Sequence, residues 1–130
     1  MTVVWTNGCF DILHRGHIEM LQYAKSLGEK LIVGLDSDSK VKISKGTNRP
    51  FNSLEDRKFL ISSVRYVDQV YDFDSKKELE NLIKHVSPDI LVVGSDWKEK
   101  EVVGSQYAGE VRFFDRIGNY STTNVLESDK

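Results

Sequence analysis

The sequence predicts an α/β fold, a single Rossmann-like, doubly wound parallel sheet with helices on both faces. Short apolar, β-branched runs alternate with segments whose apolar residues recur at helical spacing, which is typical of this class. The length of 130 residues suits one domain, and 39% hydrophobic with 29% charged residues is the balance of a globular protein. We therefore expect residues 1–130 to form one domain.

The first predicted unit is a strand, a helix and a second strand. Residues 3–6 are apolar and β-branched, and they stop at Asn7-Gly8, as a buried strand does before a turn. Apolar residues then recur at helical spacing up to Gly28, which suits a helix end. Residues 31–35 form a second apolar run. This strand-helix-strand unit predicts that the two strands pair in parallel through a right-handed crossover.

The same pattern recurs further along the chain. Ser53 with Asp56 resembles a capping box and predicts a helix through Leu60 and Val64, before a strand at 67–71. Between these units, the polar stretch 36–52 predicts a long loop, and such loops are often functional.

A third unit closes the predicted sheet. Ser75 with Glu78 repeats the capping signal, and an apolar stripe runs from there to Ser87-Pro88, which ends the helix. Residues 90–93 and 111–114 supply two further strands.

Charge and composition exclude several classes of function. A net charge of -2 provides no general attraction to nucleic acid or to an anionic membrane, so anion binding has to come from local basic clusters. No apolar stretch has the length needed to cross a bilayer, and a single cysteine excludes an internal disulfide. We expect a cytoplasmic protein with no nucleic-acid partner and no membrane partner.

The turn after the first strand is the predicted ligand site, because ligands of open parallel sheets lie beyond the carboxyl ends of the strands. His14 and His17 are three residues apart and share one side of the helix start, while Gly16 lets a ligand approach the backbone. Unpaired backbone N–H groups and the helix dipole favour an anion there. The turn therefore predicts a phosphate site.

Other interpretations of these residues are possible. Two histidines at this spacing also suit zinc ligands or plain surface residues, but His85 belongs to a different unit and no cysteine cluster exists. Cys9 lacks a nearby base, so we expect a buried structural residue rather than a nucleophile. The three-glycine dinucleotide fingerprint and the P-loop are both absent.

The segment Gly8-Cys9-Phe10-Asp11-Ile12-Leu13-His14-Arg15-Gly16-His17 resembles the signature of the cytidylyltransferase-like nucleotidyltransferases. Tyr120-Ser121-Thr122-Thr123 resembles a second motif of that family, which opens its last helix. The resemblance extends over nearly the whole chain. It implies that His14, His17, Ser121 and Thr122 hold the triphosphate of a nucleotide.

Two subfamilies compete for the closer resemblance. Residues 6–10, 45–50, 54–57 and 101–105 are similar to the heptose 1-phosphate adenylyltransferases. Residues 65–68, Asp96-Trp97 and Arg116, five before Ser121, are similar to glycerol-3-phosphate cytidylyltransferase.

Two departures from these patterns bear on the choice. Val93-Gly94-Ser95 replaces the lysine and double glycine of the heptose enzymes, whereas Ile117-Gly118-Asn119 shifts the glycine of the cytidylyl pattern by one. We expect transfer of CMP from CTP to a small phosphorylated polyol or sugar of the glycerol-3-phosphate type, with release of pyrophosphate.

Several alternatives to this function stay open. The first is ATP-dependent adenylyl transfer to heptose 1-phosphate, and the second is a non-catalytic nucleotide-binding module. The two-histidine turn also occurs in adenylyl-transferring synthetases of coenzyme biosynthesis and in aminoacyl-tRNA ligases. The short chain argues against a ligase.

The resemblance implies roles for individual residues. The predicted catalytic residues are His14, His17, Lys45 and Arg116. The predicted nucleotide-binding residues are Gly8, Cys9, Phe10, Gly16, Arg65, Asp96, Trp97, Tyr120, Ser121 and Thr122. The predicted substrate-binding residues are Asp11, Lys42 and Arg57. Mg²⁺ is expected with the nucleoside triphosphate, and a homodimer is expected, with residues 65–67 as a contact region.

Some of these residues also have a structural interpretation. Lys42 and Lys45 also suit a solvated loop, and Arg57 also suits a pair with Glu55 or Asp56. Asp11 can instead cap the following helix. A tryptophan is as often part of a core as of a base-binding site.

Overall fold

The computed structural model describes residues 1–115, which form one five-stranded sheet in the order β3-β2-β1-β4-β5. Its strands are β1 (Val3–Gly8), β2 (Lys30–Asp36), β3 (Gln69–Phe73), β4 (Ile90–Gly94) and β5 (Glu110–Phe114). All four neighbouring pairs are parallel. The order runs outward from β1 to β3 and then restarts on the other side of β1, which confirms the doubly wound class.

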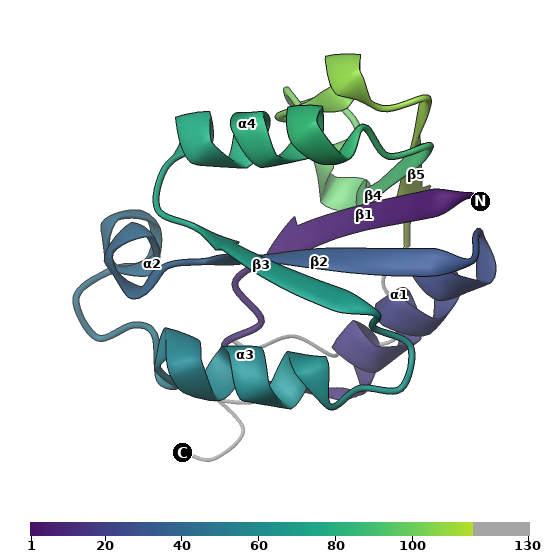
Figure 1. Cartoon of the computed structure of the whole chain (residues 1–130). Helices are drawn as coiled ribbons and strands as arrows, with labels where there is room; N and C mark the ends of the chain where they lie inside the picture. The colour runs from purple at the N-terminus through teal and green to yellow at the C-terminus, as the bar shows by residue number, and fades with distance from the viewer. Residues whose placement is uncertain (116–130) are drawn as a thin grey trace.

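Helices cover both faces of the sheet. They are α1 (Arg15–Ser26), α2 (Asp38–Lys45), α3 (Leu54–Ser62) and α4 (Lys76–Val86), with two short 3₁₀ turns, η1 (Ser95–Trp97) and η2 (Ser105–Tyr107). Figure 1 shows α4 over one face and α1 with α3 over the other. Helix α2 lies beyond the end of the sheet at which the strand arrows point.

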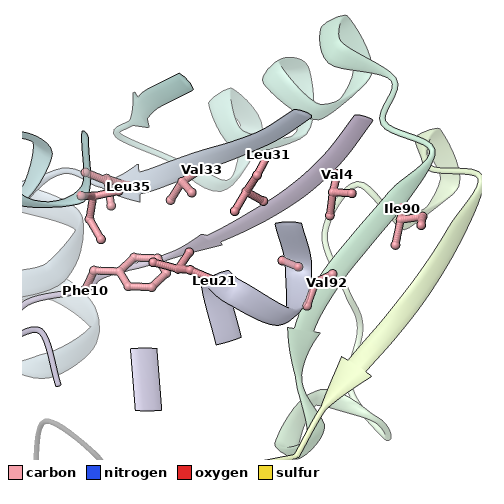
Figure 2. Close-up of a cluster of buried hydrophobic side chains, with 10 residues drawn as sticks. Val4, Phe10, Leu21, Leu31, Val33, Leu35, Ile90 and Val92 are labelled. Atoms are coloured by element: carbon pink, nitrogen blue, oxygen red, sulfur yellow. The ribbon is translucent and has the colours of Figure 1, made fainter. Parts of the chain in front are cut away.

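The core consists of two apolar clusters, one on each face, because successive side chains of a strand point to opposite faces. On the α1 and α3 face, Val4, Leu31, Val33 and Val92 pack with Leu21 of α1 (Figure 2). The other cluster comprises Trp5, Ile32, Phe73, Leu79, Ile83 and Leu91. The near-continuous apolar runs seen in the sequence are therefore strands that are buried on both faces.

The predicted helix starts are confirmed by their caps. The Ser53 hydroxyl accepts a hydrogen bond from the Asp56 amide, and the Ser75 hydroxyl accepts one from the Glu78 amide. Helix α4 ends where the Ser87-Pro88 pair predicts, and Ser87 itself adopts the left-handed conformation. Strand β3 begins at Gln69, two residues later than predicted. Asp68 precedes it and still binds β2, since its amide donates to the Leu31 carbonyl and its carboxylate accepts from the Leu31 amide.

The prediction of one long loop at 36–52 is wrong, since α2 occupies residues 38–45. The Ser37 hydroxyl accepts a hydrogen bond from the Lys40 amide and so starts this helix. Val41 is its one buried residue, whereas Ile43 is exposed. A single buried contact leaves no apolar stripe in the sequence, which is why periodicity did not reveal the helix.

Candidate active site

The turn between β1 and α1 lies at the switch point of the sheet, because β1 pairs with β2 on one side and with β4 on the other. His14 is the N-cap of α1, and its Nδ1 accepts a hydrogen bond from the Gly16 amide at 3.1 Å. In return, Nδ1 of His17 accepts from the His14 amide at 3.4 Å. The two histidines thus form a reciprocal capping box, in which imidazole replaces the usual hydroxyl and carboxylate.

This box fixes the tautomers of both histidines. A ring nitrogen that accepts an N–H bond carries no proton, so in a neutral ring the proton lies on Nε2. The two rings are stacked, with centroids 3.8 Å apart and planes inclined by 22°. The sequence therefore presents two neighbouring Nε2–H donors at the start of a helix, an arrangement suited to a phosphate.

Phe10 shapes the turn from inside the core. It is 5% exposed and has a φ of 49°, a left-handed conformation that is rare for a bulky residue. Its ring meets His17 edge-on, with centroids 5.2 Å apart. A Cβ at position 8 would lie 3.2 Å from that ring, which explains the use of Gly8.

Asp11 holds the loop that follows α2. It is 1% exposed, and its carboxylate accepts hydrogen bonds from Arg49 Nε and from the amides of Phe51 and Asn52, each at 2.8 Å. Burial raises the pKa of Asp11, but the bonds from Asn52, Phe51 and Arg49 outweigh it and leave the pKa lowered. Capping of α1 is the role of His14, so that alternative for Asp11 is wrong.

Arg57 is fully buried, and its guanidinium ties several segments together. Nη1 donates to the carbonyls of Cys9 and Asp36 at 2.9 and 2.7 Å. Nε donates to the Asn52 carbonyl at 3.0 Å, and Nη2 pairs with Asp38 at 2.7 Å. The alternative that Arg57 pairs with Glu55 or Asp56 is wrong, because its carboxylate partner lies in α2.

Cys9 is buried in the same turn. Burial raises the pKa of its thiol, although the charges of Lys45 and Arg57 act in the opposite direction. A thiol that stays protonated at neutral pH is a poor nucleophile.

Lys42 and Lys45 of α2 are exposed. Both lie in the last turn of the helix, where cations complement the helix dipole. Gly46 follows with a φ of 107° and ends the helix. The structure thus brings Lys45 to the carboxyl edge of the sheet, where the histidines lie.

Trp97 also lies at this edge, in η1, which follows β4 directly. It is 45% exposed, with the Lys100 ammonium 5.3 Å from its ring centroid. Core filling is therefore not its role. Asp96 belongs to η1 as well, but its side chain lies outside the described part of the structure.

Arg65 is not brought to the site. It follows α3 and precedes β3, so it lies at the amino edge of the sheet, opposite the histidines. Its guanidinium donates to the Tyr66 hydroxyl and lies over that ring. Nearby, Asp68 binds Lys25 and the Leu31 amide, so this stretch anchors the amino ends of β2 and β3.

Four predicted ligands, Arg116, Tyr120, Ser121 and Thr122, lie outside the described residues. Within residues 1–115, no group of three or more His, Cys, Asp or Glu could hold a metal ion. In that same part of the chain, no helix has the length and apolarity required to cross a membrane.

Sequence reasoning missed Asp38, Arg49 and Asn52, which complete the polar network around the turn. Asp11 gave one indication of this network, because a carboxylate requires a cationic partner when it is buried. Its partners lie 38 to 41 residues along the chain, so no local pattern identifies them.

A doubly wound sheet with paired histidines capping the first helix is the arrangement expected of the nucleotidyltransferases that the sequence resembles. The model of the cytidylyltransferase-like family matches residues 5–127, and the chain belongs to this family. It is a nucleotidyltransferase.

Similar proteins indicate which kind of nucleotidyltransferase the chain resembles. Bifunctional protein HldE of Nitratiruptor is 54% identical over 96% of the chain and 27% of its own length. That of Campylobacter fetus is 50% identical over 99% of the chain and 28% of its own length. The chain thus spans just over a quarter of these relatives. A lipopolysaccharide core biosynthesis protein from Thermoplasma volcanium is 30% identical, with a TM-score of 0.71 over 93% of this chain and 99% of that one.

These matches contradict the expected transfer of CMP from CTP, because HldE relatives favour the heptose 1-phosphate adenylyltransferase alternative. The features that favoured CTP included residues 65–68, which lie at the amino edge of the sheet, opposite the histidines.

Proposed function

We propose that this domain transfers AMP from ATP to a heptose 1-phosphate, forming ADP-heptose and releasing pyrophosphate. The observation that carries the proposal is the match of nearly the whole chain to HldE proteins at about half identity. The heptose 1-phosphate adenylyltransferase is the C-terminal domain of those proteins. The lipopolysaccharide core protein from Thermoplasma supports a role in making cell-envelope polysaccharide precursors.

The chemistry is an in-line displacement at phosphorus. A phosphate oxygen of the heptose 1-phosphate attacks the α-phosphorus of ATP while the bond to the β-phosphate oxygen breaks and pyrophosphate leaves. No covalent enzyme intermediate is needed, so catalysis consists of positioning and of stabilising the charge that develops on oxygen. The Nε2–H donors of His14 and His17 suit that task at the α- and β-phosphates.

Basic residues complete the proposed site. Lys45 at the end of α2 would reach both reactants, with Lys42 toward the sugar phosphate. Arg116 would hold the outgoing pyrophosphate by its planar fork, beside Ser121 and Thr122, as the family resemblance implies. Trp97 offers an exposed ring face for the base.

We propose Mg²⁺ as part of the nucleotide substrate rather than as a resident ion. The described residues offer no cage of three ligands, and both Asp11 oxygens already accept protein hydrogen bonds. Mg²⁺ usually keeps several waters and binds substrate phosphates, which needs few protein ligands.

We further propose that residues 1–130 act as one cytoplasmic nucleotidyltransferase domain and that it forms a homodimer. Phe59 is 72% and Leu60 is 40% exposed on α3, shortly before the predicted contact region 65–67. Exposed apolar side chains of this kind favour an interface.

Pyrophosphate release tests the activity. ATP and CTP should each be offered with heptose 1-phosphate and with glycerol 3-phosphate. We expect release for ATP with heptose 1-phosphate. Release for none of the four pairings would contradict the proposal and would favour a nucleotide-binding module without turnover.

A further inference from the structure

We propose that Arg57 is a positioning residue, whose buried guanidinium fixes the turn between β1 and α1 and thereby sets the position of His17. Arg57 itself lies in the first turn of α3. The kinetic part of its test rests on the proposed nucleotidyl transfer, whereas a second readout does not.

The guanidinium joins the ends of two neighbouring strands. Gly8 and Leu35 form the last pair between β1 and β2, and the carbonyls that Nη1 binds belong to the next residues, Cys9 and Asp36. Carbonyls beyond the ladder need other partners when they are buried. One nitrogen of Arg57 supplies both bonds and so holds the two strand ends together.

The turn that follows requires such support. Phe10 is left-handed, a conformation that persists in a bulky residue only where the surroundings enforce it. Its two neighbours are both held: the Cys9 carbonyl by Arg57, and the Asp11 carboxylate by Arg49 and two backbone amides. Removing the bond at Cys9 releases one side of this arrangement.

Phe10 then transmits the position of the turn to the histidines. Its ring packs edge-on against His17, whose Nδ1 in turn accepts from the His14 amide. A chain of direct contacts therefore runs from Arg57 through Cys9 and Phe10 to His17.

Arg57 has few N–H donors left with which to bind a substrate. A guanidinium has five N–H donors, and the bonds to Cys9, Asp36, Asn52 and Asp38 use four of them. The side chain is 0% exposed, whereas its partner Asp38 is 41% exposed. This geometry favours support of the site over direct contact with the acceptor.

The test uses Arg57→Lys in the full chain and reads both turnover and the chain's single cysteine, Cys9. Lysine keeps a charge beside Asp38 but cannot reproduce the planar set of four bonds. We expect kcat to fall by about tenfold or more, with the KM for ATP changed by less than about twofold. We also expect alkylation of Cys9 by iodoacetamide to accelerate severalfold, because the turn opens more often.

Urea separates local opening from unfolding. Alkylation through local opening of the turn depends weakly on urea, whereas alkylation through global unfolding depends strongly on it. Acceleration that follows global unfolding alone would overturn the proposal. The matched control is Lys58→Met, the next residue of α3, whose exposed pair with Asp72 lies apart from the turn. It should retain native kcat and native alkylation.

Other outcomes are equally informative. A raised KM for the sugar phosphate with native alkylation would mean direct substrate contact and would overturn the proposal. If Arg57→Lys does not fold, Asp38→Asn keeps an acceptor for Nη2, and smaller changes in the same directions are expected. Native kcat and alkylation in Asp38→Asn would then count against the proposal. If the domain does not adenylylate heptose 1-phosphate, alkylation of Cys9 still tests the role of Arg57.

Discussion

At the scale of residues, the histidine pair caps helix α1 and is also proposed to bind the phosphates of the nucleotide. Nδ1 of each ring satisfies a backbone amide of the first turn of α1, and this use leaves Nε2–H as the donor side. The spacing of His14 and His17 predicted a shared ligand, but the hydrogen bonds that set the tautomers are seen only in the structure. The same holds for Asp11 and Arg57, whose partners are distant in sequence.

His17→Asn separates the two roles of His17. The asparagine oxygen can replace Nδ1 as the acceptor of the His14 amide, while the Nε2–H donor is lost. We expect kcat to fall by about 10²–10³-fold with the free energy of unfolding within about 0.5 kcal/mol of native. His17→Ala should lose a further ~1 kcal/mol of stability along with the cap. Steady-state kinetics measures kcat of the two variants, and urea unfolding measures their free energy of unfolding. Near-native turnover of His17→Asn would contradict the catalytic role.

Asp11 makes stability depend on pH at the acid end. Its pKa is lowered in the folded protein from an ordinary value of 3.8, since the bonds from Asn52, Phe51 and Arg49 outweigh burial. The stabilisation is therefore complete above that ordinary value and is lost as the pH falls through the lower, folded value.

Asp11→Asn tests this dependence. We expect the variant to be less stable at pH 7 by about 1–3 kcal/mol, because an amide cannot accept all three donors. The difference from the native chain should shrink below pH 3.8, as the native carboxylate becomes protonated. Urea unfolding at pH 7 and pH 3 provides the comparison, and an equal difference at both values would refute the assignment.

At the scale of elements, most helices and strands followed from local signals. Serine caps and apolar stripes marked α3 and α4, and apolar runs marked the strands. Helix α2 was not predicted, because Val41 is its one buried residue. This element bears on the proposed function, since it carries Lys45 to the edge where the histidines lie.

The position of Lys45 can be measured through Cys9. The Lys45 ammonium lowers the pKa of the Cys9 thiol, so Lys45→Met should raise that pKa further and slow alkylation at a given pH. We also expect kcat/KM to fall, because a cation near the phosphates is lost. The control for the thiol is Lys42→Met, with the same change of charge one turn away. A thiol pKa unchanged in Lys45→Met would show that Lys45 points elsewhere.

At the scale of the whole molecule, the alternation of elements predicted the sheet and its switch point. Parallel pairing and crossover rules leave few arrangements for such a pattern. The same pattern already predicted that Arg65 lies between a helix and the start of the next strand, and the structure has it before β3, opposite the histidines. The resemblance of its motif to the cytidylyl enzymes nevertheless suggested a place near the nucleotide.

Self-association is also a property of the whole molecule. We expect sedimentation at micromolar concentration to give twice the chain mass. A charge placed at Phe59, which is 72% exposed, should shift the equilibrium towards monomer with little loss of stability. A native chain that sediments as a monomer would rule out the homodimer.

The most direct test of adenylyl transfer to heptose 1-phosphate is a competition between nucleotides for this acceptor. Equal concentrations of ATP and CTP are supplied with heptose 1-phosphate and Mg²⁺, and the sugar nucleotide formed is identified by mass spectrometry alongside released pyrophosphate. We expect ADP-heptose as the main product, in equal amount to pyrophosphate. Formation of a CDP-linked sugar in its place would contradict adenylyl transfer.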